Sequence, residues 1–243
     1  MSGHSKWANI RVKKAKTDAA KGKIFTKIGK EMSIAIREGG PNPQNNAKLR
    51  ELIAKAKANN VPNDNIERCI KKFSGEDNTV YEEISYEGYG PAGIAVIVET
   101  TTDNRNRTAG NVRSYFSKYG GNLGQNGCVS YLFSERGTIL IENEDGDIEE
   151  DALMEAALEA GATDFEADED CFTVYTEPDD VFAVRDALTA AGYAVASAEV
   201  AKIPSTFVTL SDEGEIKNMS NLLDKLEDDD DVQNVYHNWE NIQ

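Results

Sequence analysis

The chain has 243 residues, of which 40% are hydrophobic, and a formal net charge of −17, so packed cores are expected and wholesale disorder is excluded. This length predicts two or three domains. Its three cysteines include no CxxC pair, which argues against a disulfide framework or a zinc cluster, and no apolar run approaches the ~18 residues of a membrane span. We therefore expect a cytoplasmic protein with reduced thiols.

The charge is unevenly distributed along the chain. Residues 1–75 contain 17 lysines and arginines and six acids, a net charge of +11, whereas the remainder holds nine bases and 37 acids, a net charge of −28. Such asymmetry predicts a basic module joined to an acidic body, and the body is expected to be able to engage basic proteins.

The basic module is predicted to contain three helices. Apolar residues recur at three- and four-residue intervals over residues 19–38, and Gly39 and Gly40 end the pattern. Two further helices are expected at 45–59 and from Pro62 to Gly75. Four basic residues fall on the face of the first helix opposite its apolar stripe: Lys23, Lys27, Lys30 and Arg37.

After Gly75 the periodicity changes to that of strands. We predict a hairpin of strands 81–89 and 94–98, a helix over 106–119, a loop at GGNLGQNG and a strand at 129–133. A compact βαββαβ pattern, typical of a ferredoxin-like domain, then follows. Its expected elements are strand 138–142, helix 149–160, strands 164–167 and 171–177, helix 178–191 and strand 194–200.

The chain is expected to end with an αβ segment. It comprises strand 206–210, helix 213–226 and strand 232–237, with Glu227–Asp231 between the last two as a solvated helix end or turn. The predicted class is therefore α+β with three domains, the third inserted into the second. These are a basic helical nucleic-acid-binding domain at 1–77, an α+β domain at 78–135 plus 204–243, and a ferredoxin-like insertion at 136–203.

Two short motifs resemble a cofactor-binding motif and a metal-binding motif. GYGPAG matches the dinucleotide pattern G-x-G-x-x-G, but strand residues follow it where a helix is needed, so we interpret it as a hairpin connection. ENEDGDIEED resembles a calcium loop, yet Ile141 and Ala152 occupy its first and last ligand positions. We predict no catalytic site, no metal site and no cofactor. A metal-dependent enzyme built from scattered carboxylates stays a minor alternative.

The basic residues point to nucleic acid instead. An arm of Lys6, Arg11, Lys13, Lys14 and Lys16 is expected to neutralise phosphates, and Lys23, Lys27 and Lys30 extend this surface along the first helix. Trp7 either stacks on an unpaired base or anchors the arm to the helical core. The segment TDNRNRT lies at a helix start, where Thr102, Asp103 or Asn104 is expected to cap the helix. Alternatively, its Arg105 and Arg107 contact either RNA or the acids of the chain itself.

Several long segments resemble the YebC/PmpR family, which includes the mitochondrial translational activator of cytochrome oxidase. They are GHSKWANI, KTDAAKGKIFTKIGKE, VPNDNIERCIKK, YEGYGPAGIAVIVE, TDNRNRT and GGNLG, in this order along the chain. The resemblance implies three domains with the third inserted into the second. It also implies a DNA-binding transcriptional regulator, a ribosome-associated factor that assists translation through proline-rich stretches, or both.

One departure from the family limits what can be carried over. Many members have Lys-His-Arg-Lys where this chain has Arg11-Val12-Lys13-Lys14, so no histidine role is expected here. The expected partners are DNA or ribosomal RNA and, through the acidic body, basic ribosomal proteins, with no membrane and no small-molecule substrate. The alternative from another class is a protein–protein adaptor.

Overall fold

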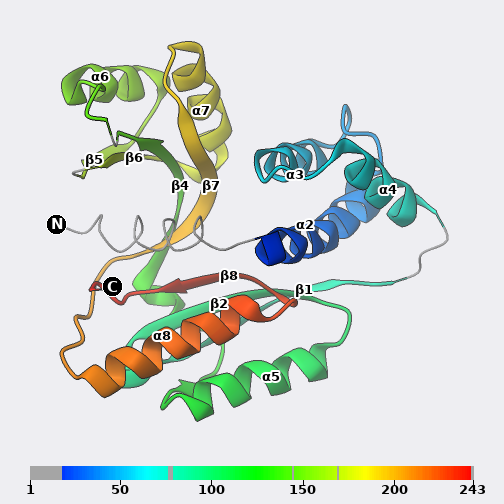
Figure 1. Cartoon of the computed structure of the whole chain (residues 1–243), viewed down its shortest axis with the longest axis vertical. Helices are drawn as coiled ribbons and strands as arrows, with labels where there is room; N and C mark the ends of the chain where they lie inside the picture. The colour runs from blue at the N-terminus through cyan, green and yellow to red at the C-terminus, as the bar shows by residue number, and fades with distance from the viewer. Residues whose placement is uncertain (1–17, 76–78, 144, 169, 242–243) are drawn as a thin grey trace. The chain divides into compact units, whose positions relative to one another are not determined.

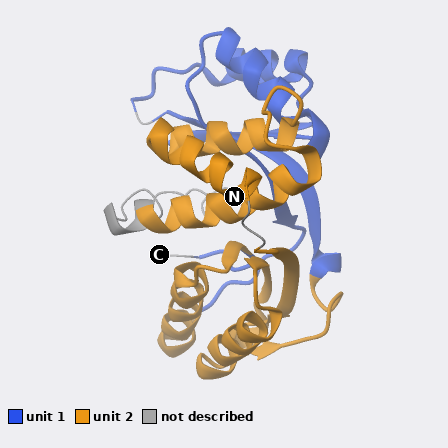
Figure 2. Ribbon diagram, turned by 90° about the vertical axis from the view of Figure 1, so that its right-hand side faces the viewer, with its two compact units in different colours: residues 1–13, 130–210, 236–243 blue, residues 14–129, 211–235 orange. Residues whose placement is uncertain are grey.

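The computed structural model describes residues 18–75, 79–143, 145–168 and 170–241. Within them, seven α-helices and two four-stranded sheets confirm the predicted α+β class. These elements belong to two compact units (Figure 2). Unit 1 holds residues 130–210 and 236–241, and unit 2 holds residues 18–129 and 211–235. The division into three domains stays a prediction.

Unit 2 begins with three helices, as predicted. They are α2 (Asp18–Gly39), α3 (Ala47–Ala58) and α4 (Asn63–Ser74). The apolar stripe of α2 packs with those of α3 and α4 around Ile28, Met32 and Leu49, each at most 1% exposed. Asn46 caps α3 by accepting a hydrogen bond from Leu49 N at 3.0 Å, and its amide donates to Ala35 O of α2 at 2.7 Å.

The sheet of unit 2 has the strand order β3-β1-β2-β8. Its members are β1 (Glu82–Tyr89), β2 (Ala95–Thr102), β3 (Asn122–Leu123) and β8 (Val232–His237). Strands β1 and β2 form an antiparallel hairpin closed by the short 3₁₀ helix η1 (Pro91–Gly93), where Ala92 and Gly93 adopt φ of 52° and 80°. The interpretation of GYGPAG as a hairpin connection is confirmed.

Two helices cover one face of this sheet (Figure 1). They are α5 (Arg105–Lys118) and α8 (Glu213–Asp228). Val112 and Phe116 of α5 and Leu222 of α8 are fully buried. Strand β2 is buried along nearly its whole length, which agrees with the continuous apolar run in its sequence.

Unit 1 contains the predicted βαββαβ pattern. Its elements are β4 (Phe133–Glu142), α6 (Glu150–Ala160), β5 (Asp164–Ala167), β6 (Cys171–Thr176), the 3₁₀ helix η3 (Pro178–Asp180), α7 (Val181–Ala190) and β7 (Val195–Pro204). The order β5-β6-β4-β7, antiparallel throughout, is that of a ferredoxin-like domain. Helices α6 and α7 cover one face, where Leu153 and Val184 pack on Ile139 (Figure 1).

Three strand predictions require correction. The strand expected at 129–133 is largely the 3₁₀ helix η2 (Ser130–Leu132), and β4 starts at Phe133 rather than at 138 because it pairs with β7 from Phe133↔Pro204 onward. The strand expected at 206–210 is reduced to an isolated bridge between Val208 and Trp239. Strand β3 lies inside the predicted loop GGNLGQNG, since two residues are too few for an alternating pattern to mark them.

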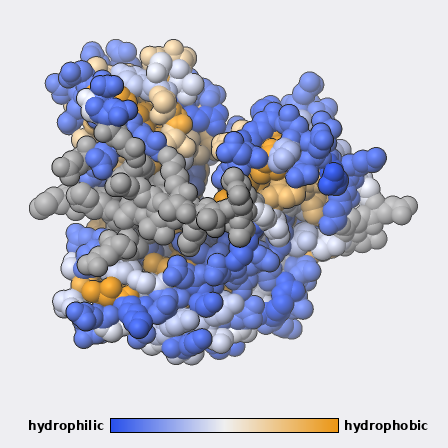
Figure 3. Space-filling view, in the orientation of Figure 1, coloured by the Kyte–Doolittle hydropathy of each residue, from blue (hydrophilic) through white to orange (hydrophobic). Residues whose placement is uncertain are grey.

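The visible face of the described residues is mostly hydrophilic, and its hydrophobic residues form small separate patches (Figure 3). None of the helices in the described ranges is both long and apolar enough to cross a membrane.

Candidate nucleic-acid interface

The predicted contact residues divide into two groups. Six of them lie outside the described residues: Lys6, Trp7, Arg11, Lys13, Lys14 and Lys16. The other five lie in unit 2, on α2 and α5: Lys23, Lys27, Lys30, Arg105 and Arg107.

Lys23, Lys27 and Lys30 form a lysine stripe along α2, because residues three and four apart share a helix face. Each Nζ donates to a main-chain carbonyl at the end of α8 or just after it. Lys27 reaches Glu227 O at 2.7 Å, Lys23 reaches Asp228 O at 3.3 Å, and Lys30 reaches Asp230 O at 2.7 Å. Carbonyls at a helix C-terminus lack partners within the helix and carry its negative dipole end. The lysine stripe thus caps α8.

The stripe also meets carboxylates of residues 227–231, which we call the acidic run. Lys23 Nζ lies 3.0 Å from Asp228 Oδ1, and this pair is about half-exposed. Lys30 Nζ lies 2.6 Å from Asp231 Oδ1, with side chains only 12% and 5% exposed. The expectation of a solvated helix end or turn is therefore wrong for Asp231, because this residue is buried. Its backbone carbonyl accepts a hydrogen bond from Thr101 N of β2 at 2.7 Å.

Asp231 is the centre of a polar cluster. Besides Lys30, it accepts hydrogen bonds from Arg107 Nη2 at 2.7 Å and Thr108 Oγ1 at 2.8 Å. Burial by itself would raise the pKa of Asp231, but the hydrogen bonds from Lys30, Arg107 and Thr108 outweigh it and lower this pKa below its ordinary value. Asp231 is therefore held as a carboxylate between two cations.

Arg107 binds acids of its own chain, which is one of the two alternatives that its sequence left open. Its Nη2 also lies 2.8 Å from Asp103 Oδ1, and the hydrogen bonds to Asp231 and Asp103 raise its pKa. The segment has the predicted capping role as well, because Asn104 Oδ1 accepts from Arg107 N at 3.1 Å at the start of α5. Arg105, the first residue of the same helix, is exposed.

The acidic run is tied to α5 by a second contact. Asp229 Oδ2 accepts from Asn111 Nδ2 at 3.1 Å and from the Tyr115 hydroxyl at 3.0 Å. Burial, together with the hydrogen bond to Asp229, raises the pKa of Tyr115 to about 12. The end of α8 is thus fixed by side chains from both α2 and α5.

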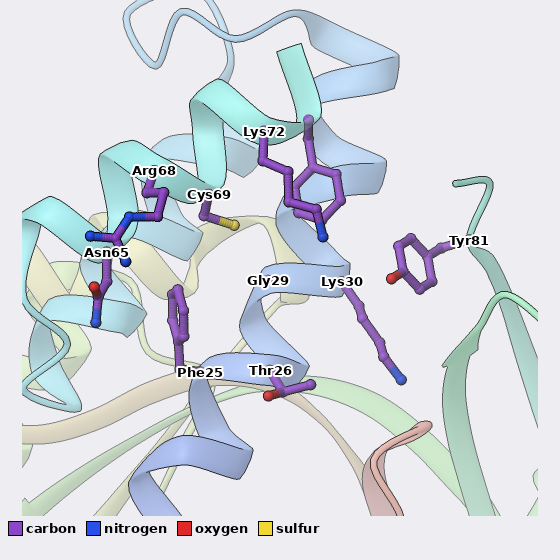
Figure 4. A pocket seen from close by; sticks show the side chains of 10 residues that line it. Phe25, Thr26, Gly29, Lys30, Asn65, Arg68, Cys69, Lys72 and Tyr81 are labelled. Atoms are coloured by element: carbon purple, nitrogen blue, oxygen red, sulfur yellow. The ribbon is translucent and has the colours of Figure 1, made fainter. Parts of the chain in front are cut away.

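A groove between α2 and α4, which we call the α2–α4 groove, adds residues that the sequence patterns did not single out (Figure 4). Arg68 and Lys72 of α4 line it together with Phe25 of α2 and Tyr81, which lies just before β1. The i, i+4 spacing of Arg68 and Lys72 was a readable signal of a basic stripe. Their meeting with Phe25 depends on how α2 and α4 pack.

Cys69 also lines the α2–α4 groove. Burial raises the pKa of its thiol to about 11, against a smaller opposing effect of Lys72. The thiol is therefore protonated at neutral pH and a poor nucleophile. Within the described residues, no three side chains of the types His, Cys, Asp and Glu are grouped so that they could hold a metal ion.

The fold and these contacts define a class of multidomain α+β protein with a cationic helical module and a ferredoxin-like domain. Residues 5–76 match the family model described as the TACO1/YebC protein N-terminal domain, and residues 81–239 match the one described as the TACO1/YebC second and third domain. The chain belongs to the TACO1/YebC family.

The chain is similar to several proteins over nearly their whole length. A "probable transcriptional regulatory protein" of Lachnoclostridium phytofermentans is 57% identical over 241 residues, covering 99% of this chain and 100% of the relative. One of the same name from Agathobacter rectalis is 59% identical with the same coverage, 99% and 100%. The crystal structure of a conserved hypothetical protein from Aquifex aeolicus has a TM-score of 0.83 at 44% identity and covers 93% of each chain.

Proposed function

We propose that this chain is a non-enzymatic, cytoplasmic regulator of gene expression that binds nucleic acid through its basic N-terminal module. The observation that carries the proposal is the net charge of +11 on residues 1–75 of a chain whose total is −17. Such a module attracts a polyanion and gains affinity by releasing condensed counterions. The name of the relatives, probable transcriptional regulatory protein, supports DNA as one target.

Ribosomal RNA is the other proposed target, with a role in translation through proline-rich stretches. The contacts of Lys30 and Arg107 are already made within the chain, so we assign these two residues to holding the acidic run. Phosphate contacts are assigned to the arm, to the half-exposed Lys23 and to the exposed Arg105, with Lys27 contributing charge. Phosphate contacts position a protein without reading sequence, which suits folded RNA as well as duplex DNA.

The salt dependence of binding tests the proposal. We expect the full chain to bind labelled single-stranded RNA and duplex DNA with an affinity that falls steeply with salt, measured by fluorescence anisotropy. Changing Lys13 and Lys14 together to Gln should lower the slope of log K against log salt by about 0.7 per lost contact on a single strand and about 0.9 on duplex DNA. The matched control changes Lys217 and Lys225 of the acidic body to Gln and should leave the slope unchanged.

Trp7 offers an internal reporter for the same titration. The other tryptophan, Trp239, is 1% exposed, so a change in tryptophan emission on adding RNA reports mainly on Trp7. Quenching of this emission supports stacking on a base, and an unchanged spectrum supports the anchoring role.

The two targets are separated by sedimentation of cell extract. Co-migration with ribosomal subunits that survives DNase but not RNase supports the translational role. Sedimentation with DNA that survives RNase but not DNase supports the transcriptional role. Affinity that does not respond to salt for either nucleic acid would contradict the proposal as a whole.

The docking of the lysine stripe on the acidic run favours a second candidate, a protein–protein adaptor. In that case the module neutralises acids of its own chain, and the acidic body, at −28, engages basic proteins such as those of the ribosome. This candidate predicts little salt-sensitive binding to either nucleic acid.

A further inference from the structure

The α2–α4 groove combines cationic and aromatic side chains. Three of its lining residues are cations, three are aromatic and none is an acid. The lining residues are Phe25, Thr26, Gly29, Lys30, Asn65, Arg68, Cys69, Lys72, Phe73 and Tyr81. Apolar walls with cations beside them offer both surfaces that a nucleotide needs, a face for the base and charge for the phosphate.

The cations lie beside the aromatic rings. Lys72 Nζ is 5.0 Å from the centroid of the Phe73 ring, and Lys30 Nζ is 6.0 Å from that of Tyr81. Phe73 and Tyr81 meet edge to face, with centroids 6.3 Å apart. Figure 4 shows Phe25 toward one end of the groove and Tyr81 at the other, with Lys72 between them. A base that enters would therefore meet aromatic surface while its phosphate faces ammonium or guanidinium groups.

Gly29 keeps the floor of the groove open. A Cβ placed on Gly29 would have a single neighbour within 4 Å, Cys69 Sγ at 3.6 Å, which is an ordinary contact. Alanine therefore fits there, whereas a longer side chain extends into the groove. Substitutions of increasing size at Gly29 would therefore fill the groove step by step.

The volume of the groove limits what it can take. It is about 270 Å³, below the roughly 300–1,000 Å³ of sites that enclose a drug-sized ligand. Such a volume suits a single base better than a dinucleotide cofactor. Bases in a duplex are stacked on both faces and cannot enter, whereas a single strand can turn one base outward.

We propose that the α2–α4 groove binds one unpaired nucleotide of a single-stranded nucleic acid, with its base against Phe25 and Tyr81 and its phosphate against Arg68 and Lys72. This inference rests on the proposed function, which it extends by a preference for single strands. The groove adds a stacking contact to the sequence-independent phosphate contacts of the basic module.

The first test fills the groove in the full chain. Gly29→Leu should weaken binding of a short labelled single-stranded RNA about 5- to 150-fold, the loss expected for one stacked base, and leave binding of the matching duplex unchanged. Gly29→Ala is the control and should bind both as the unchanged chain does. A single-stranded DNA of the same sequence shows whether the groove distinguishes RNA from DNA.

A second variant covers the case in which Gly29→Leu disturbs the packing of α2. Arg68→Gln with Lys72→Gln changes two exposed side chains of α4 and should weaken single-strand binding more than duplex binding. Lys57→Gln with Lys71→Gln removes the same charge from exposed positions outside the groove and should weaken both equally. Circular dichroism shows which variants are folded.

Crosslinking supplies an independent readout. RNA that carries 4-thiouridine should crosslink under ultraviolet light to peptides that contain Phe25 or residues 65–73.

Equal single-strand binding by the unchanged chain, by the Arg68/Lys72 variant and by folded Gly29→Leu would overturn the groove proposal and leave the proposed function standing. If the unchanged chain shows no salt-dependent binding at all, the proposed function itself fails.

Discussion

Replacing Asp231 by Asn is expected to lower the free energy of unfolding of unit 2 by about 3 kcal/mol, the lower end of the range for breaking a buried ion pair. The carboxylate is 5% exposed and lies between Lys30 and Arg107, so its loss leaves Lys30, 12% exposed, without its countercharge. The cost stays at the lower end because Arg107 is about half-exposed and keeps part of its hydration. Urea unfolding, with hydrogen exchange of the amides of α2 and α5, measures the change.

Asp228→Asn is the matched control, because Asp228 belongs to the same acidic run and also pairs with a lysine of α2. The Lys23–Asp228 pair is 45% and 56% exposed, and such pairs contribute no more than about 1 kcal/mol. The control should therefore change stability little. Equal losses in the two variants would mean that burial of Asp231 does not determine its contribution.

Lowering the pH should remove the stabilising contribution of Asp231 in the unchanged chain as well. Since the pKa of Asp231 is lowered in the folded state, its stabilising effect is fully present above the unfolded value of about 3.9 and is lost as the pH falls through the folded value. The stability of unit 2 should fall below about pH 4, and part of this fall should be missing in Asp231→Asn. The difference between the pH profiles of the unchanged chain and of Asp231→Asn shows whether Asp231 loses its stabilising effect on acidification, as its lowered pKa predicts.

The helices of the basic module were predictable because their signals are local. The apolar spacing around Ile28 and Met32, the two glycines at the end of α2 and the proline that precedes α4 lie within or beside the helices that they define. The ferredoxin-like domain was predictable for a similar reason, since alternating elements of ordinary length allow few topologies. The full length of β4 was not, because it depends on pairing with β7.

The partners of the lysine stripe could not be predicted in the same way. Periodicity placed Lys23, Lys27 and Lys30 opposite the apolar stripe, but that face need not be exposed to solvent. Lys27 and Glu227 are 200 residues apart, and only the tertiary fold brings α8 to this face. The i, i+4 pair of Asp103 and Arg107 was readable in the sequence, whereas the contact of Arg107 with Asp231, 124 residues away, was not.

The loss of stability on replacing single residues of GYGPAG should show the structural role of each residue in the motif. Gly88→Ala is expected to destabilise unit 2 by about 3 kcal/mol, the upper end of the usual cost of overpacking. A Cβ there would lie 2.6 Å from Asn122 O and 3.1 Å from Leu123 Cα, and these backbone atoms cannot rotate away. Strand β3 pairs with β1 at this position, Gly88↔Leu123, so the substitution pushes the two strands apart.

The turn residues of the same motif supply the comparison. Gly93→Ala should cost about 1–2 kcal/mol, because Gly93 has φ of 80° but no atom within 4 Å of an added Cβ. Ala92→Gly should cost little or nothing, since Ala92 already has φ of 52°. Urea unfolding of the three variants gives the order. A largest loss at Gly88 would mean that this glycine is needed for strand packing, whereas equal losses at Gly88 and Gly93 would contradict this account.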